Sequence, residues 1–398
     1  ENILSMVADD IGMDQYEIRI KNLIKDGDRC ANGQRVFGSK FHEAFEAVVK
    51  GIGWEEHKAN KRPNRGIGFG AVSSATGASR FAGHTSSAAV VKITEDGTAT
   101  VVHGGTEIGQ GIDTVMAMIT AEVLGLPMES IRIGVEDTDD TILEAGMYAS
   151  RGTVWGGGAV KAAAEDARQQ LADVAAEMLE VAPEKLAFKG GRVFVADNPE
   201  RGHPMLDVVR HSDYDLGKPI YGRGSWTAPR IDYPDFEGTG LGVHPFAYAV
   251  VFQAIEVEVD PGTGKVKVIK SVTGDELGQP INSQMLAAGL EGGTICELGQ
   301  ALYEGVEVGD NGQPLNADFS EYRMPTHMDA PPQDVHHVIS PSEYTVFGAK
   351  GGGEISCASS LGAVVNAVGD AVGHRFTELP ITPQKIVKAL KEKGKGGK

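Results

Sequence analysis

The chain has 398 residues, of which 41% are hydrophobic and 23% charged, the composition of an ordinary globular protein. A single hydrophobic core stops growing at about 250–300 residues, so this length predicts two lobes. The formal net charge of −18 argues against binding to nucleic acid or to an anionic membrane, because both attract basic surfaces. The apolar runs look too short to span a bilayer and no signal peptide opens the chain, so we expect a cytoplasmic protein.

Two residue counts narrow the chemistry further. The three cysteines, Cys30, Cys296 and Cys357, are isolated, which predicts reduced thiols and no CxxC site for an iron–sulfur cluster within this chain. Glycine is nearly twice as frequent as usual, with 53 residues that fall in clusters. Such clusters indicate places where the backbone turns sharply or approaches a neighbour closely.

The first part of the chain, residues 1–65, has a helical pattern followed by a polar linker. Apolar residues at helical spacing, Ile3, Leu4, Val7 and Ile11, share one face of the first helix. Nothing precedes this helix to cap or anchor it. We therefore interpret this part as an N-terminal helical segment that continues a domain begun on another chain.

Residues 66–240 are expected to form a first lobe of strands and helices. A strand begins with alternate glycines at 66, 68 and 70, which predicts tight packing against a neighbouring element. A hairpin with an Asp-Gly turn follows, and then a helix that ends at Gly125. A glycine-rich start at 148–158 leads into a second, longer helix.

Residues 241–398 are expected to form a second lobe that repeats the first. Its hairpin turns at "PGTG", and both hairpins lead into the pattern E-[IL]-G-Q-x-I-[DN], at 107–113 and at 276–282. We interpret this as an internal repeat, although hairpins and helix caps could also converge by chance. The predicted fold class is α+β, with two related lobes of β-hairpins, mixed sheets and helices that grip a ligand between them.

Three glycine-rich segments precede helix N-termini, at 104–111, 148–153 and 346–356. Helix N-termini offer unpaired N–H groups and a partial positive charge, so together these segments predict a large anionic cofactor. Polar side chains could assist: the amide of Gln110, the hydroxyls of Ser150 and Thr153, and the guanidinium of Arg151. Each segment taken alone is also what an ordinary helix cap looks like.

The segments "GGTEIGQGIDT", "MYASRGT" and "FGAKGGGE", in this order, resemble the molybdenum hydroxylases. That family includes xanthine dehydrogenase, aldehyde oxidoreductase, carbon monoxide dehydrogenase and nicotinate dehydrogenase. The flanking stretches agree, among them "TELPITPQKIVKAL", and the similarity runs from Glu1 to about Leu390. The resemblance implies the molybdopterin-binding domain of the xanthine dehydrogenase type, in the C-terminal part of an apparently split large subunit.

The resemblance also implies roles for individual residues. Molybdenum would be held by a pterin dithiolene and by no protein ligand, with or without a nucleotide extension such as cytosine dinucleotide. Glu354 matches the catalytic base, and we expect it to be buried against the cofactor. Lys350 is expected either to bind a phosphate or to extend along the surface. The residues expected to contact the cofactor are Gly109, Gln110, Gly111, Ala149, Ser150, Arg151, Thr153, Lys350, Gly351, Gly352 and Gly353.

Two departures from the family pattern stand out. The family's first cofactor segment and its arginine-containing substrate segment would both lie upstream of Glu1, which implies either a second polypeptide that carries them or an incomplete chain. Position 289, often glutamine in the family, is Gly289 here, so one polar contact to the pterin is missing or supplied elsewhere. The family's 2Fe–2S centre and FAD would belong to an iron–sulfur subunit and a flavin subunit.

The sequence therefore predicts the catalytic, molybdenum-binding half of a multisubunit hydroxylase. Its substrate would be an aromatic or N-heterocyclic compound oxidised at an electron-poor carbon with oxygen from water. An aryl-CoA reductase, or an enzyme that oxidises an aldehyde or carbon monoxide, is the alternative within the family. A non-catalytic scaffold subunit is the alternative outside catalysis, whereas a simple nucleotide-binding protein lacks support because no P-loop pattern is present.

Overall fold

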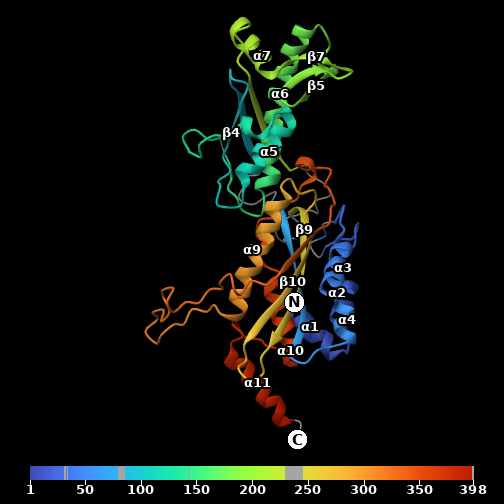
Figure 1. The fold of residues 1–398 in the computed structure, drawn as a ribbon, viewed down its shortest axis with the longest axis vertical. Coiled ribbons are helices and arrows are strands. Elements are labelled where there is room, and N and C mark those ends of the chain that lie inside the picture. Colours follow the sequence, from blue (N-terminus) through green and yellow to red (C-terminus); the bar gives the residue numbers. More distant parts are fainter. Residues whose placement is uncertain (31–32, 34, 79–85, 143, 229–244, 397–398) are drawn as a thin grey trace.

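The computed structural model describes residues 1–30, 33, 35–78, 86–142, 144–228 and 245–396 (Figure 1). The molecule is elongated, and its two lobes follow one another along the long axis. Each lobe contains its own four-stranded sheet with helices packed against it. The predicted α+β class with two related lobes is confirmed.

The sheet of the second lobe has the strand order β1-β9-β10-β11, in which only β10 and β11 are parallel. Both faces are buried, because α3 packs against one face and α10 against the other. Alternating apolar residues of β9, such as Phe252 and Ile255, therefore serve two separate cores. The elements are β1 (Arg65–Ala78), β9 (Pro245–Val259), β10 (Val266–Glu276), β11 (Gln333–His337), α3 (Phe41–Ile52), α9 (Ser283–Leu302), α10 (Ser360–Val372) and α11 (Pro383–Gly396).

The sheet of the first lobe has the order β4-β3-β2-β8, in which only β3 and β4 are parallel. Helices α5 and α6 bury one large core against it, and α5 ends at Gly125 as predicted. A small sheet, β5-β6-β7, lies at the far end of this lobe (Figure 1). The elements are β2 (Ser86–Ile93), β3 (Ala99–His103), β4 (Ile131–Ile133), β5 (Leu186–Lys189), β6 (Arg192–Val195), β7 (Asn198–Pro204), β8 (Tyr221–Thr227), α5 (Ile112–Leu124), α6 (Gly157–Leu179) and α7 (Met205–Arg210).

The N-terminal helices belong to the second lobe. Phe45 of α3 contacts Phe69 of β1 and Phe252 of β9, with ring centroids 5.6 and 5.0 Å apart. On α1, however, the shared apolar face points to solvent, and Ile3 is 76% exposed. The remaining helices of this segment are α1 (Asn2–Asp10), α2 (Gln15–Asn22) and α4 (Trp54–Ala59).

The two lobes are built as a repeat with exchanged edge strands. Each sheet consists of a hairpin, a parallel strand beyond it and an antiparallel edge strand before it. Strand β1 directly precedes the hairpin β2–β3 but pairs with β9, and β8 precedes β9 but pairs with β2. The predicted boundary at residue 66 is therefore wrong: residues 66–78 lie in the second lobe, because their hydrogen bonds go to β9.

The edge strands pack on their helices in the same way. An added Cβ at Gly66 would lie 2.1 Å from the carbonyl oxygen of Ala367, and one at Gly222 would lie 2.0 Å from that of Ala163. This confirms the close packing predicted from the alternate glycines. In each lobe a helix carboxylate also accepts from the strand: Asp370 from the Ile67 N–H at 3.1 Å, and Asp166 from the Arg223 N–H at 2.8 Å.

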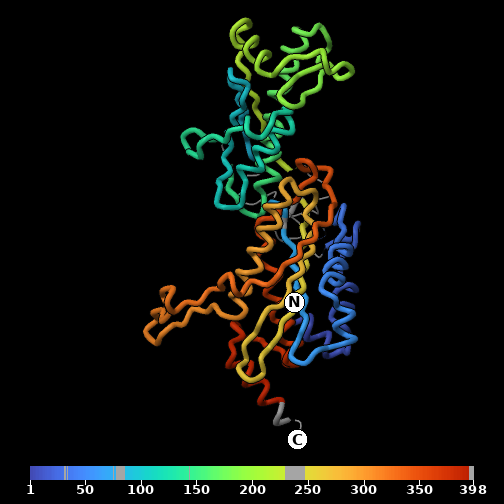
Figure 2. The backbone as a smooth tube through the Cα atoms, viewed as in Figure 1, coloured from blue at the N-terminus to red at the C-terminus, as the bar shows by residue number. Residues whose placement is uncertain are grey.

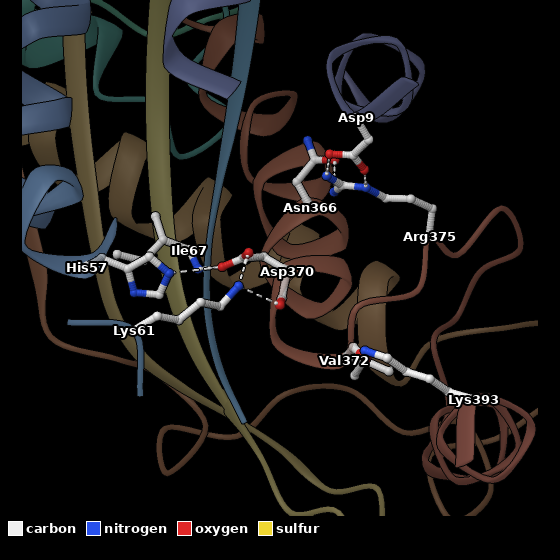
Figure 3. A network of polar contacts seen from close by, with 9 residues as sticks. All are labelled: Asp9, His57, Lys61, Ile67, Asn366, Asp370, Val372, Arg375 and Lys393. Carbon is white, nitrogen blue, oxygen red and sulfur yellow. Dashed lines mark hydrogen bonds and ion pairs between the residues drawn. The ribbon is translucent and has the colours of Figure 1, made fainter. Parts of the chain in front are cut away.

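Asp370 is the centre of a wider polar network (Figure 3). Besides the Ile67 N–H, its carboxylate contacts His57 Nε2 at 2.9 Å and the ammonium group of Lys61. Although Asp370 is largely buried, these partners lower the pKa of its carboxyl below the usual value. The network joins α4, β1 and α10, and so ties the N-terminal segment to the second lobe.

One expectation about membranes needs correction. Residues Glu354–Val372 are apolar and long enough to cross a bilayer, with a mean hydropathy of 1.4. However, 61% of this stretch is buried within the protein. Its helix, α10, packs against β1 and β9, so it is a core helix of the second lobe.

Candidate active site

A cavity of about 550 Å³ opens where the loops of the two lobes meet. Its size is that of a site for a cofactor or a drug-sized ligand. The first lobe contributes residues between 108 and 153, and the second contributes residues between 277 and 289 and between 349 and 356. Of the predicted site residues, Gly109, Gln110, Ser150, Thr153, Lys350, Gly352, Gly353 and Glu354 line this cavity, whereas Gly111, Ala149, Arg151 and Gly351 do not.

Glu354 lies at the wall of the cavity, held by the opposite lobe. Its Oε1 accepts a hydrogen bond from the N–H of Ala149 at 3.0 Å, and its own N–H donates to Ser150 Oγ at 3.0 Å. The expected burial of Glu354 is wrong for this chain, in which the residue is exposed.

The backbone beside Glu354 adopts an unusual conformation. Ala149 and Ser150 have φ values of 50° and 52°, in the left-handed region that residues other than glycine rarely occupy. Phe347, on the opposing segment, has a φ of 47°. Backbone strain of this kind is concentrated at ligand-binding and active sites. Here it turns the Ala149 N–H toward the Glu354 carboxylate.

The glycines before Glu354 have two different roles. An added Cβ at Gly351 would lie 1.9 Å from the carbonyl oxygen of Ser150, so this glycine allows the two lobes to approach. At Gly353, by contrast, the nearest atom would be Ser150 Oγ at 3.8 Å. An added Cβ at Gly352 would lie 3.0 Å from Leu286 Cδ1. Open space therefore lies beside Gly353, whereas Gly351 and Gly352 pack against protein.

The loop before α5 is shaped by its own side chains. Gln110 accepts a hydrogen bond from the Ile108 N–H and donates to the Thr106 carbonyl, at 2.7 and 2.8 Å. Glu107 accepts from the N–H groups of Gly109 and Gly111 at 2.7 and 3.0 Å. The prediction that this helix N-terminus is open to an anion is wrong, because the Glu107 carboxylate occupies it.

The N-terminus of α10 is also occupied from within the chain. Glu297 Oε2 accepts hydrogen bonds from the N–H groups of Ser360 and Leu361, at 2.5 and 2.9 Å. Glu297 is buried on α9, far away in the sequence, and no local pattern indicates the pairing. Of the three predicted anion-binding N-termini, two therefore hold a carboxylate of this protein, and the 148–153 segment faces the cavity.

Two predicted cationic ligands are engaged in buried ion pairs. Arg151 lies 3.0 Å from Glu144 Oε1 and donates to Ser87 Oγ, so its guanidinium is not directed at a phosphate. Lys350 Nζ lies 2.8 Å from both carboxylate oxygens of Glu276. The predicted surface position of Lys350 is therefore wrong, whereas its predicted contact with a phosphate stays a prediction.

Sequence reasoning missed a group of acids behind the cavity. Asp113, at the start of α5, lies near Glu107 and Glu136, and its Oδ1 is 3.4 Å from Nε2 of buried His103. Partial burial and the two neighbouring carboxylates raise the pKa of Asp113 to about 6. Burial lowers the pKa of His103. The Asp113 position in the repeated pattern was visible in the sequence, but its neighbours were not.

Comparisons with known proteins agree with this geometry. Residues 47–331 match the family described as molybdopterin cofactor-binding domain. The chain is 30% identical to the nicotine 6-hydroxylase large subunit of Paenarthrobacter nicotinovorans, over 98% of this chain and 49% of that protein. It is 32% identical to a probable hypoxanthine oxidase of Escherichia coli, over 76% of this chain and 30% of that protein. The crystal structure of quinoline 2-oxidoreductase from Pseudomonas putida superposes with a TM-score of 0.85 and 27% identity, over 98% of this chain and 51% of that one.

The residues at the cavity fit a molybdopterin. The open backbone at Gly353 provides a cradle that a side chain would fill, and an added Cβ at Gly289 would meet no atom within 4 Å. Polar groups that could bind a pterin, among them Gln110 and Thr153, line the same cavity.

The match covers most of the chain, and the superposition covers nearly all of it. The chain spans about half the length of the nicotine 6-hydroxylase large subunit. The resemblance predicted from three short segments is thus confirmed. This chain belongs to the molybdopterin cofactor-binding domains of the molybdenum hydroxylase family.

Proposed function

We propose that this chain is the catalytic, molybdopterin-binding part of a multisubunit hydroxylase with an aromatic or N-heterocyclic substrate. The observation that carries the proposal is the Glu354 carboxylate at the wall of a 550 Å³ cavity, held by the N–H of Ala149 from the other lobe. The names of two similar proteins, a nicotine 6-hydroxylase and a quinoline 2-oxidoreductase, support the substrate class.

The chain's own residues would do three things in this reaction. Gln110, Ser150 and Thr153, with the open backbone at Gly353, would hold the pterin. When bound, the molybdenum cofactor would activate an oxygen from water and accept two electrons. Glu354 would take and hold the proton on Oε2, because Oε1 is bound by the Ala149 N–H.

The walls of the cavity suit a flat, weakly polar substrate. Its lining includes many aliphatic side chains and few charged ones, which favours an aromatic ring over a charged metabolite. Oxidation of an aldehyde or carbon monoxide, or reduction of an aryl-CoA, is the alternative within the family. The aliphatic side chains are Ile108, Ile112, Val115, Leu277, Ile281 and Leu286.

The complete enzyme would need other polypeptides. Since the chain spans about half of a relative's large subunit, the other half would complete the site. Electrons would leave through a 2Fe–2S subunit and an FAD subunit, because the three cysteines here are too few to ligate a cluster. One relative is named as subunit gamma of a dehydrogenase complex, which supports such an assembly. We place the complex in the cytoplasm, and the pterin could carry a nucleotide extension.

The test combines metal content with turnover in the purified complex. We expect about one molybdenum per chain, and we expect Glu354→Gln to keep the metal while turnover of an N-heterocycle falls by about two to four orders of magnitude. Ser356→Ala, at the same cavity, is the matched control and should keep most of the activity. A complex without molybdenum would support the scaffold alternative, and near-normal turnover by Glu354→Gln would refute the role of Glu354.

A further inference from the structure

A long segment between α9 and β11, residues 303–332, leaves the body of the second lobe as an extended arm (Figure 2). No residue from 303 to 330 is buried, and the arm contributes to none of the hydrophobic cores. Its shape is maintained by short polar contacts: Asn316 donates to the Gly305 carbonyl at 2.7 Å, and the Tyr322 hydroxyl donates to Glu304 at 2.8 Å.

Despite this exposure, the arm is rich in large apolar side chains. Phe319 and Met328 are 82% and 80% exposed, values usual for charged residues. A shaped segment without a core, which presents several apolar side chains, is typical of a protein-binding surface. The exposed apolar residues of the arm are Val306, Val308, Leu315, Phe319, Met324 and Met328.

The charge of the arm restricts what can cover it. It has six carboxylates and a single arginine, Arg323, so it is strongly acidic between its apolar residues. Two copies of the arm would bring like charges together, and the whole chain carries −18. The fitting partner has an apolar groove bordered by Lys and Arg. The six acids are Glu304, Glu307, Asp310, Asp318, Glu321 and Asp329.

We propose that the arm docks on the half of the large subunit that lies outside this chain. The chain spans 49% of the nicotine 6-hydroxylase large subunit and 51% of the quinoline 2-oxidoreductase chain, so a polypeptide of similar size is available to cover it. The inference rests on the proposed function, which requires that half. The arm leaves from the C-terminal end of α9, and Met285, Leu286 and Gly289 of the same helix line the cavity. Docking would therefore hold one wall of the active site in place.

Photo-crosslinking in the native complex tests this surface. Phe319 is replaced by p-benzoylphenylalanine in the tagged full chain, which is expressed in its own host, irradiated and purified, and the linked peptides are sequenced by mass spectrometry. Tyr214, 71% exposed in the first lobe, is the matched control position. We expect Phe319 to link to peptides that match the other half of a molybdenum hydroxylase large subunit, and Tyr214 not to do so.

A link from Phe319 to a second copy of this chain, to an iron–sulfur or flavin polypeptide, or to nothing would overturn the proposal. So would equal labelling from both positions. As an independent measurement, Phe319→Glu with Met328→Glu should lower the amount of that half recovered with the chain at least about tenfold, whereas Tyr214→Glu should not. The proposed function is tested separately, by the molybdenum content and by the effect of Glu354→Gln in complexes whose arm is unchanged. Either inference can therefore fail without the other.

Discussion

Glu354 and Ser150 are joined across the two lobes by a hydrogen bond of 3.0 Å between residues 204 positions apart in the sequence. The same separation relates Ala367 of α10 to Ala163 of α6, which pack identically on their edge strands. The two residues thus occupy equivalent positions in the repeat. In the second lobe this position carries the acid, Glu354. In the first lobe it carries Ser150, whose hydroxyl and backbone turn hold that acid.

Ser150→Ala removes the acceptor of the Glu354 N–H, and we expect it to impair catalysis by misplacing the acid. A hydrogen bond is worth about 1 kcal/mol, so kcat should fall about fivefold to tenfold with little change in KM. Because Ser150 acts through Glu354, the pH dependence of kcat should also shift. Unchanged kcat and pH profile in a variant with full molybdenum content would show that Ser150 does not position the acid.

Gly351→Ala and Gly353→Ala should separate packing from cofactor binding. At Gly351 the new methyl group would overlap the Ser150 carbonyl, so we expect a loss of about 1–3 kcal/mol of unfolding free energy. At Gly353 the methyl group would point into open space, so the unfolding free energy should stay within about 0.5 kcal/mol while molybdenum content falls. Urea unfolding and metal analysis of both variants provide the comparison. Equal stability losses would argue against two different roles.

Lys350→Met should destabilise the protein because it leaves Glu276 buried without its counter-ion. Both side chains are almost inaccessible, at 3% and 0% exposure, and breaking such a pair costs about 3–5 kcal/mol. Burial already raises the pKa of Glu276, so its proton uptake would accompany the loss. The double variant Lys350→Met with Glu276→Leu should recover most of the stability in thermal unfolding. If the single variant were stable but lost the cofactor, Lys350 would be a ligand after all.

Asp113→Asn should change how stability depends on pH. The folded protein raises the pKa of Asp113 to about 6, so it favours the protonated carboxyl. The resulting stabilisation of the folded state is complete below pH about 4 and is lost as the pH rises through about 6. The side chain is 35% exposed, so solvent screening limits the gain of the Asn variant to ~1 kcal/mol at pH 7. Unfolding free energies at pH 4.5 and pH 7 measure this. If the unfolding free energy changed by the same amount between these two pH values in wild type and in Asp113→Asn, the raised pKa of Asp113 would be contradicted.

Several parts of the fold could be predicted from the sequence because they depend on local patterns. Alternating apolar residues around Asp-Gly and Pro-Gly turns predicted both hairpins, and Gly125 predicted the end of α5. The repeated E-[IL]-G-Q pattern predicted the relation of the lobes. The three glycine-rich segments predicted the family, and most of the predicted site residues do line one cavity.

Other features depend on partners that are distant in the sequence. The exchange of β1 and β8 could not be predicted, because either strand fits either hairpin by its own pattern and the choice depends on which helix its glycines meet. The carboxylate that occupies the N-terminus of α10, Glu297, could not be identified either, because it lies 64 positions from the Leu361 N–H and any nearby acid satisfies an N–H group equally well.

The sequence by itself thus determined the elements, their repetition and the chemical family, because turns, periodicity and glycine spacing act over a few residues. Only the tertiary structure decided that Lys350 pairs with Glu276 and that Ala149 holds Glu354. The buried ammonium group of Lys350 pairs with the carboxylate that folding brings next to it. The carboxylate of Glu354 is positioned by the backbone that packs against it. The first pair joins residues 74 positions apart within the second lobe, and the second joins the two lobes across 205 positions, so no local pattern reveals either pair.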